Sequence, residues 1–399
     1  MTRWKKRSFI IAGVVVLFLT LAAAFFYRPT RLALERAESF AFRRLAVSLQ
    51  KENGAFRFFF ATNRTIANET LAPENQFGSQ RQKEMSYGFF DTTIEPHLGL
   101  GMIINPTDWF QNEEIQILHT QKTSEEELVS QLTQQVNDSP HRSLLISVNG
   151  FREQFPSALR KTAFLSHVLD INTPHLVFDW PGNQGSTLRG YRPAQSNATA
   201  SGPELADLLR IIHTDVQPQR LWLLANSMGA QVVVHALKDL ADENQLADRA
   251  LKIGHVVLTA PDVDVSLLDE LFREKVDQLT NHFTTYVSSN DRALLMSRLI
   301  NRERRLGQST LNPRNQGLDQ SEEATALYDL LSPGDDLMTL VDVTPINRTR
   351  NFHNFSLETP EFFDDLFLRL LHENQVMSRS EYRVQGAAGR VYSVLTQAR

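Results

Sequence analysis

The 399-residue sequence contains no cysteine. Disulfide bonds, thiol nucleophiles and thiolate metal sites all need a cysteine sulfur, so the sequence excludes them. Basic residues are not in surplus either, because 41 Lys and Arg stand against 46 Asp and Glu and the net charge is −5. A protein that binds nucleic acid usually presents a basic face. We therefore expect no nucleic-acid partner.

Signature motifs for cofactors and metals are also missing. The sequence has neither the H-E-x-x-H pattern of zinc peptidases nor the G-x-x-x-x-G-K-[ST] loop that binds nucleotide phosphates. We therefore expect a protein that works without a cofactor or a metal. Its composition, with 42% hydrophobic and 22% charged residues, is that of a globular protein.

One long hydrophobic run is present, and it lies at the N-terminus. Residues 9–26 carry no charge and follow the basic cluster of Arg3, Lys5, Lys6 and Arg7. The run approaches the ~20 residues that span a bilayer as a helix and exceeds the ~7–15 apolar residues usual in a signal peptide. We predict that it is a membrane anchor or uncleaved signal; a signal peptide cleaved near Ala22, Ala23 and Ala24 is the competing interpretation.

The predicted anchor occupies residues 1–30, and residues 31–55 are predicted to continue it as an amphipathic connector helix. Basic residues ahead of an apolar helix favour a cytoplasmic N-terminus and an exported body. We therefore expect the body of the protein on the periplasmic side of a bacterial inner membrane.

Residues 56–372 are predicted to form one α/β domain. Apolar strands alternate with helical patterns, which indicates a mostly parallel sheet covered by helices on both faces. The predicted strands are 56–64, 113–120, 144–148, 175–180, 220–225, 255–260 and 283–288, and the predicted helices are 124–136, 155–169, 203–215, 229–243, 264–279 and 359–371. Residues 65–105 show no regular pattern, residues 301–340 form a polar excursion, and residues 373–399 are predicted to be a polar C-terminal tail.

A serine interrupts one of these strand–helix units. Residues 222–237 read WLLANSMGAQVVVHAL, so Ser227 follows an apolar strand and precedes a helical pattern, with Ala225 and Gly229 on either side. The nucleophile elbow G-x-S-x-G has this context, because small residues let the strand and the helix approach around a strained turn. The competing interpretation is a plain turn in which the serine caps the helix.

A serine hydroxyl acts as a nucleophile only with a base to take its proton and a carboxylate to orient the base. His353 is the candidate base, because it lies in a loop while the other histidines after Ser227 lie in predicted helices or at strand starts. Asp291, just past the strand at 283–288, is the preferred acid. Asp262, past the preceding strand, is the alternative acid and equally suits a helix cap.

An oxyanion hole needs two backbone N–H groups that point at the developing negative charge. One is expected from Met228, directly after the serine. The other is expected from Phe151, in the loop after the strand at 144–148, where Gly150 permits the bend.

Several segments together resemble a bacterial α/β-hydrolase family of unassigned function whose members are described as esterase/lipase-superfamily enzymes. The resemblance covers residues 56–370 and rests on FFFATNR, FGSQR, LLISVNGF, FDWPGNQG, LLANSMGAQV, VVLTAPDVD, SSNDRAL and FHNFS. It implies the α/β-hydrolase fold and a triad of Ser227, Asp291 and His353.

The sequence departs from this family at three positions. Asn226 and Asn149 stand where the family has histidine, and Ala225 replaces the more general glycine of the elbow. Asparagine can keep a side-chain hydrogen bond at both histidine positions, and none of the changes removes a member of the predicted triad.

The sequence therefore predicts a membrane-anchored serine hydrolase that cleaves a small-molecule or lipid ester through an acyl-enzyme. The alternative is a catalytically silent α/β-hydrolase fold that serves as a binding or scaffold protein at the membrane, with the three departures as marks of lost activity. Nothing in the sequence indicates an oligomeric state.

Overall fold

The computed structural model describes residues 16–17, 45–50, 52, 54–94, 115–185, 188–244, 251–267, 276–303, 305–308, 338–349, 352–372, 381–385 and 391–396. Most of the predicted anchor, most of the connector and most of the polar excursion lie outside the described residues. Among the helices that are described, none combines the length and the apolar character needed to cross a bilayer.

The described end of the predicted connector is not helical. Residues 45–50 form a turn, and Leu49 makes an isolated antiparallel bridge to Phe56. Gly54 has a φ of 69°, and its N–H donates to the carbonyl of Gln50 at 2.9 Å. This tight turn directs the chain into the first strand, so the predicted connector helix does not continue to the start of the domain.

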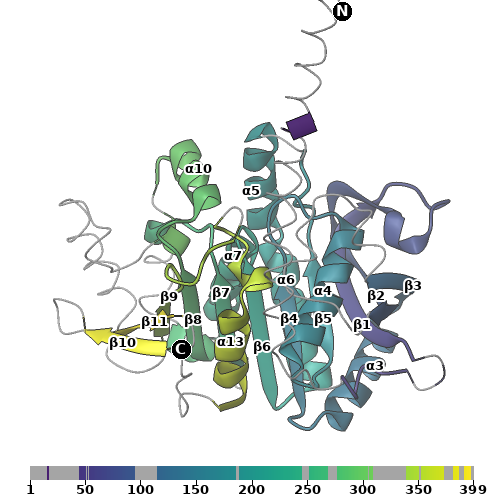
Figure 1. Cartoon of the computed structure of the whole chain (residues 1–399). Helices are drawn as coiled ribbons and strands as arrows, with labels where there is room; N and C mark the ends of the chain where they lie inside the picture. Colours follow the sequence, from purple (N-terminus) through teal and green to yellow (C-terminus); the bar gives the residue numbers. More distant parts are fainter. Residues whose placement is uncertain are drawn as a thin grey trace, which may run out of the picture.

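One sheet of eleven strands runs through the described residues (Figure 1). In spatial order its strands are β10 (Glu381–Gln385), β11 (Val391–Leu395), β9 (Met338–Asp342), β8 (Thr280–Val287), β7 (Ile253–Thr259), β6 (Arg220–Asn226), β4 (Ser143–Val148), β5 (His175–Asp179), β1 (Phe56–Ile66), β2 (Phe77–Ile94) and β3 (Ile115–Thr123). From β11 to β1 all neighbours are parallel, while antiparallel pairs close both ends of the sheet. The predicted mostly parallel sheet is confirmed.

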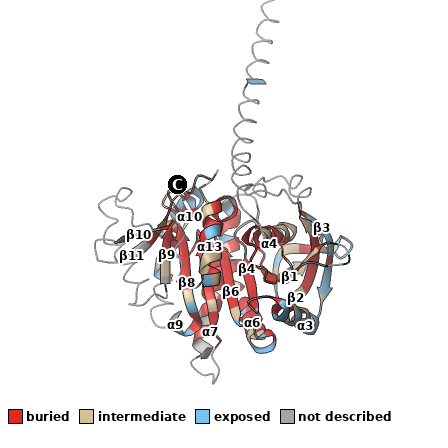
Figure 2. Cartoon of the chain, turned by 60° about the horizontal axis from the view of Figure 1, so that its bottom comes forward, coloured by how far each residue is buried: buried red, intermediate tan, exposed pale blue. Residues whose placement is uncertain are grey.

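Helices cover both faces of the sheet, as the alternation of strands and helices predicts (Figures 1 and 2). They are α3 (Glu125–Asp138), α4 (Phe155–Leu169), α5 (Tyr191–Ala200), α6 (Gly202–Ile211), α7 (Gly229–Asn244), α9 (Val276–Leu279), α10 (Arg292–Asn301), α12 (Phe355–Glu358) and α13 (Pro360–His372). Buried residues of α3, α5, α6 and α7 join one hydrophobic cluster, and those of α4 and α13 join a second.

The central strands separate these two clusters. In β4, Ile146 belongs to the first cluster and Leu145 to the second, and in β6 the same division holds for Leu223 and Trp222. Successive side chains of a strand point to opposite faces, so a strand that is apolar throughout must be buried on both sides. Figure 2 shows these central strands as buried along most of their length. Burial on both faces holds the carboxyl ends of β4, β6, β7 and β8 in fixed relative positions.

Two predictions about regular structure were wrong. The region 65–105, expected to be irregular, contains β2, whose first half is only partly buried and therefore lacks an apolar pattern. The predicted polar tail contains β10 and β11, which pair with each other and extend the sheet beside β9. An edge hairpin needs few apolar residues, because packing against an existing sheet supplies most of its stability.

Close strand packing at Gly88 generates a stability prediction. Gly88 in β2 lies opposite Phe60 in β1, and a Cβ there would meet the Phe60 ring at 2.4 Å and the carbonyl oxygen of Gln121 at 2.1 Å. Gly88→Ala is expected to lower the free energy of unfolding by about 1–3 kcal/mol, because the strands must shift to admit the methyl group. Urea denaturation of the full chain in mild detergent measures the loss.

Gly254→Ala in β7 is the matched control, because the nearest atom to a Cβ there is the Leu221 carbonyl oxygen at 3.2 Å. A smaller loss is expected for this variant. Equal losses for the two variants would contradict the steric explanation.

Candidate active site

Ser227 stands in a tight turn between β6 and α7. Its φ is 53°, in the left-handed region that costs a non-glycine residue roughly 1–3 kcal/mol. Its N–H donates to the carbonyl of Thr259 at the end of β7, at 2.9 Å. A Cβ on Gly229 would lie 2.5 Å from the carbonyl oxygen of Asn149 and 2.6 Å from that of Val148, so glycine is required for α7 to begin against the end of β4. The predicted strand–turn–helix arrangement is present.

Asp291 and His353 form a hydrogen-bonded pair. Asp291 caps the N-terminus of α10, and its Oδ1 accepts the Leu294 N–H at 2.9 Å. Its Oδ2 accepts a hydrogen bond from Nδ1 of His353 at 2.6 Å. The aspartate is almost fully buried, whereas the imidazole remains partly accessible. The helix cap therefore holds the carboxylate in one orientation, and the carboxylate in turn orients the imidazole.

The pKa of His353 lies above its usual value near 6.5. Burial lowers this pKa, but the negative charge of Asp291 and the hydrogen bond from Nδ1 together raise it by more. In the neutral imidazole the Nδ1 proton faces the aspartate, and Nε2 is left as an acceptor. A ring held in this way can take a proton from a hydroxyl group.

The alternative acid, Asp262, has different partners. Its Oδ2 accepts a hydrogen bond from the Tyr191 hydroxyl at 2.7 Å, and its Oδ1 accepts one from Ser297 at 2.5 Å. Oδ1 also lies 2.9 Å from Nε of the fully buried Arg305. Asp262 is therefore committed to a buried ion pair beside the serine turn, and the structure pairs His353 with Asp291 instead.

A cavity of about 300 Å³ brings the serine and the histidine together. Ser227 and His353 both line it, and part of its wall is apolar, formed by Phe151, Met296 and Ile300. The cavity lies beyond the carboxyl ends of β4, β6 and β8, which is where ligands bind to open parallel sheets. Three side chains that are far apart in the sequence thus meet at one edge of the sheet.

The predicted oxyanion loop passes directly against the serine. A Cβ on Gly150 would lie 2.9 Å from Cβ of Ser227, so the loop approaches the turn as closely as a glycine allows. Nε1 of Trp180 donates to the carbonyl of Asn149 at 2.7 Å and holds the start of the loop. Phe151 follows immediately and lines the same cavity as Ser227.

The two asparagines that replace family histidines behave differently. Nδ2 of Asn226 donates to the hydroxyl groups of Thr259 at 3.0 Å and Ser356 at 3.2 Å. Nδ2 of Asn149 is buried and makes no hydrogen bond with the described part of the chain. Both line a cavity of about 20 Å³, enough for roughly one water molecule. Asn226 therefore keeps a side-chain hydrogen bond at its position, whereas Nδ2 of Asn149 makes none with the described residues.

The sequence did not assign a role to Arg64, yet this residue braces the site. Its guanidinium is fully buried and pairs with Asp179 at the end of β5. It also donates to the carbonyls of Trp180 at 2.7 Å, Glu153 at 2.8 Å and Gly78 at 3.0 Å. The available signal in the sequence was a charged residue at the end of an aromatic strand. A charge at such a position is buried with the strand, and a buried arginine must find several acceptors. Arg64 thus connects β1 and β2 to the two loops beside Ser227.

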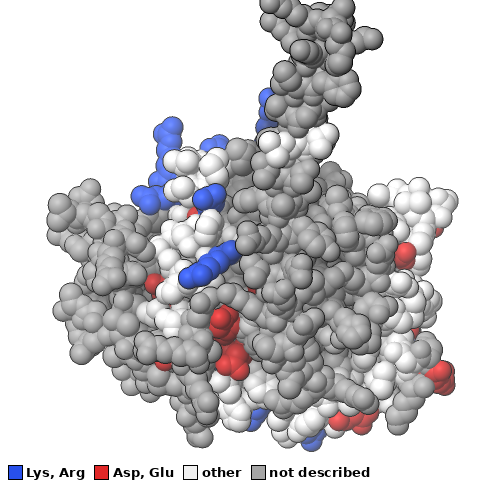
Figure 3. Space-filling model, in the orientation of Figure 1, with Lys and Arg blue, Asp and Glu red and all other residues white. Residues whose placement is uncertain are grey.

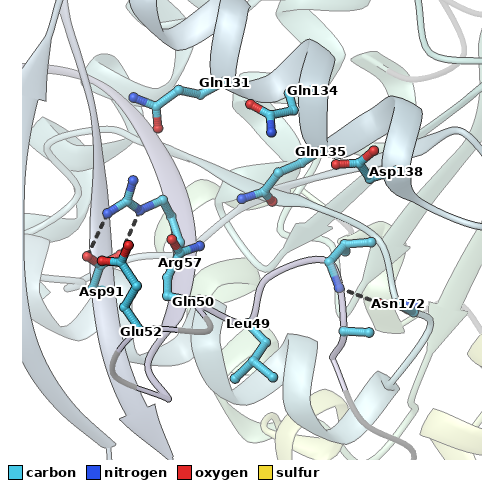
Figure 4. Close-up of a pocket in the computed structure, with 12 residues that line it drawn as sticks. Leu49, Gln50, Glu52, Arg57, Asp91, Gln131, Gln134, Gln135, Asp138 and Asn172 are labelled. Carbon is cyan, nitrogen blue, oxygen red and sulfur yellow. Dashed lines mark hydrogen bonds and ion pairs between the residues drawn. The ribbon is translucent and has the colours of Figure 1, made fainter.

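A larger cavity, of about 910 Å³, lies at the amino ends of β1 and β5, away from Ser227 (Figure 4). Figure 4 shows Gln131, Gln134 and Gln135 of α3 on one side and the Arg57–Asp91 ion pair on the other. The described residues that line it include neither serine nor histidine. Nor do the described residues contain a group of three or more His, Asp or Glu side chains placed to hold a metal ion.

Comparison with solved structures gives a distant neighbour. The chain is similar to the zinc-bound structure of a cold-adapted esterase from an Arctic intertidal metagenomic library, with 12% sequence identity and a TM-score of 0.36. The similarity covers 83% of this chain and 100% of the other. Similarity at this level does not indicate the activity of the chain. Comparison with curated protein sequences gives no match.

A family model gives the decisive comparison. The model of an α/β hydrolase of unknown function, DUF900, matches residues 124–366, which is more than half of the chain. The matched region contains the serine turn, the Asp291–His353 pair and the loop that carries Phe151. The resemblance predicted from the sequence is confirmed, and the chain belongs to the α/β-hydrolase family DUF900.

Proposed function

We propose that this α/β hydrolase is a serine hydrolase that cleaves carboxylic esters through an acyl-enzyme intermediate. The observation that carries the proposal is the convergence of Ser227, on a left-handed turn, and the Asp291–His353 pair at one cavity. A structural serine has no need of a buried carboxylate–imidazole pair beside the same cavity. Ser227 is the nucleophile, His353 the base and Asp291 the orienting acid.

The reaction begins when Nε2 of His353 takes the hydroxyl proton of Ser227 as Oγ attacks the ester carbonyl carbon. The carbonyl oxygen becomes an oxyanion, which the backbone N–H groups of Phe151 and Met228 stabilise. When the intermediate collapses, His353 returns its proton to the departing alcohol and the acyl group stays on Ser227. Water, deprotonated by His353, then attacks the acyl-enzyme, and His353 returns that proton to Oγ of Ser227 as the carboxylic acid leaves.

We also propose that the N-terminal segment tethers this enzyme to a bacterial inner membrane, with the catalytic body on the periplasmic side. The uncharged run at residues 9–26 and the basic cluster before it support the tether. Small-molecule or lipid esters are the substrates that fit the proposed chemistry. A silent scaffold is the alternative function, and the observation that favours it is Nδ2 of Asn149, which is buried and has no hydrogen-bond partner among the described residues.

Covalent labelling separates the enzyme from the scaffold. A fluorophosphonate probe is expected to label the wild-type full chain, because it reacts only with an activated serine hydroxyl. Ser227→Ala is expected to abolish labelling, and His353→Ala to slow it at least ~10³-fold. In-gel fluorescence measures the labelled fraction over time.

Ser289→Ala is the control, because Ser289 lies in the loop after β8 and contacts Thr344 rather than the cavity. This variant should be labelled as fast as the wild type. A wild-type chain that resists the probe would establish the scaffold instead.

The Asp291–His353 pair predicts the pH dependence of ester hydrolysis. Protonated His353 cannot accept the serine proton, so kcat/KM should fall as the pH drops through the pKa of His353. This pKa is raised, so the midpoint of the acid limb should lie above the usual histidine value near 6.5. Asp291→Asn should move the acid limb to lower pH and reduce kcat by up to ~10⁴-fold.

Asp262→Asn provides the comparison, because Asp262 pairs with Arg305. It should lower the midpoint of the acid limb less than Asp291→Asn does, because the charge of Asp262 also raises the pKa of His353, but by less than that of Asp291. A shift of the midpoint in Asp262→Asn, with none in Asp291→Asn, would identify Asp262 as the orienting acid. Measurement of kcat/KM against pH, with a chromogenic short-chain ester as substrate, gives the midpoint for each variant.

A further inference from the structure

Helix α10 presents an apolar face to solvent beside the catalytic cavity. Leu295, Met296 and Leu299 of this helix are 47%, 42% and 65% exposed. Their spacing places them together on one side of the helix. Single exposed leucines are ordinary on a protein surface, but adjacent ones that form a patch usually mark a contact with something apolar.

Contacts on the inner face of α10 fix the orientation of the helix, so its outer face stays exposed. Leu294 is buried. Ser297 accepts a hydrogen bond from Nε of Arg305 at 2.7 Å, and Nδ2 of Asn301 donates to the Tyr191 hydroxyl at 3.0 Å. The helix is thus anchored along its length by groups beneath it. Rotation of α10 to bury its exposed leucines would break these hydrogen bonds.

Basic side chains surround the apolar face. Arg292, Arg298 and Arg302 are exposed on α10 and at its end, and Arg192 of α5 is exposed beside it, with Nη2 at 3.5 Å from the carbonyl of Ile300. Glu303 is the exposed acid that follows. Figure 3 shows Lys and Arg atoms around the region where Figure 1 places α10. This region is therefore basic although the whole chain has a net charge of −5.

The apolar face is continuous with the cavity that contains Ser227. Met296 belongs to both, since it is exposed on the helix and also lines the cavity. Ala293 and Ile300 line the cavity from the same helix. A molecule that enters the cavity along α10 therefore passes from an apolar, basic surface directly to the proposed nucleophile.

We propose that α10 docks on an anionic lipid surface and that the cavity takes its ester from that surface. Leu295, Met296 and Leu299 lie at the boundary between headgroups and acyl chains, while the arginines contact lipid phosphates. Exposed leucines flanked by arginines on one helix are the pattern of an interfacial helix. The docking surface does not depend on the proposed hydrolase function, whereas the substrate class, a lipid ester, rests on it.

The absence of cysteine makes a direct test possible, because any introduced cysteine is the only one. Leu299→Cys in the full chain is labelled with the environment-sensitive fluorophore NBD and reconstituted into phosphatidylcholine vesicles with or without phosphatidylglycerol. Leu118→Cys is the matched control, because Leu118 is 51% exposed but lies on β3 at the far edge of the sheet. Flotation verifies that both labelled proteins are bound to vesicles.

With phosphatidylglycerol, the emission at position 299 should shift to shorter wavelength and be quenched by doxyl-labelled acyl chains. The label at position 118 should do neither. The combined change Arg298→Gln and Arg302→Gln should reduce the shift at 299. Equal emission at the two positions, or an identical response without phosphatidylglycerol, would overturn the docking proposal. A shift at 299 that depends on protein concentration in the absence of vesicles would indicate contact between copies of the chain instead.

Activity measurements separate this proposal from the proposed function. Leu295→Gln with Leu299→Gln should slow hydrolysis of a vesicle-embedded ester at least several-fold while leaving hydrolysis of a soluble short-chain ester unchanged. Insertion of the label without hydrolysis of either ester would reject the hydrolase but keep the docking surface. If the double variant hydrolysed each ester as fast as the wild type does, the proposal that the membrane supplies the substrate would be rejected.

Discussion

The backbone contact between α7 and the end of β4 is the constraint on which the site depends. Gly229 lets the helix begin against the carbonyl groups of Val148 and Asn149, and only then can Ser227 occupy its left-handed turn. The strain of that turn is offset by the hydrogen bond from the Ser227 N–H to Thr259 at the end of β7 and by burial of the strands on both faces. The same contact brings the loop with Phe151 against the serine, so one close approach positions the proposed nucleophile and oxyanion donor together.

Two buried arginines complete this edge of the sheet. Arg64 ties β1 and β2 to the loops after β4 and β5, and Arg305 ties the loop after β7 to α10 through Asp262 and Ser297. Breaking a buried ion pair by removing one partner is costly, because the other charge is left without compensation. These arginines therefore hold the loops around the cavity rigidly, and they also fix the helix whose outer face carries the apolar patch.

The sequence predicted the central strands and the principal helices well, because strands buried on both faces and amphipathic helices have strong local patterns. It did not predict β2 or the hairpin of β10 and β11, since strands at the ends of a sheet are partly exposed and their patterns are weak. It also did not predict α10, which has few buried residues. The role of Arg305 could not be predicted for another reason, because a charge buried by distant parts of the chain looks like any surface charge in the sequence, and for Arg64 the only signal was its place at the end of an aromatic strand.

The amino-acid sequence by itself determined the family, the parallel α/β architecture and the small residues around Ser227, because all of these follow from local patterns. It also narrowed the proposed base to His353 and the acid to Asp291 or Asp262. Only the tertiary structure paired His353 with Asp291 rather than Asp262, raised the pKa of His353 and left the leucines of α10 exposed. Each of these properties depends on distances between residues far apart in the chain, and such distances exist only once the sheet has assembled.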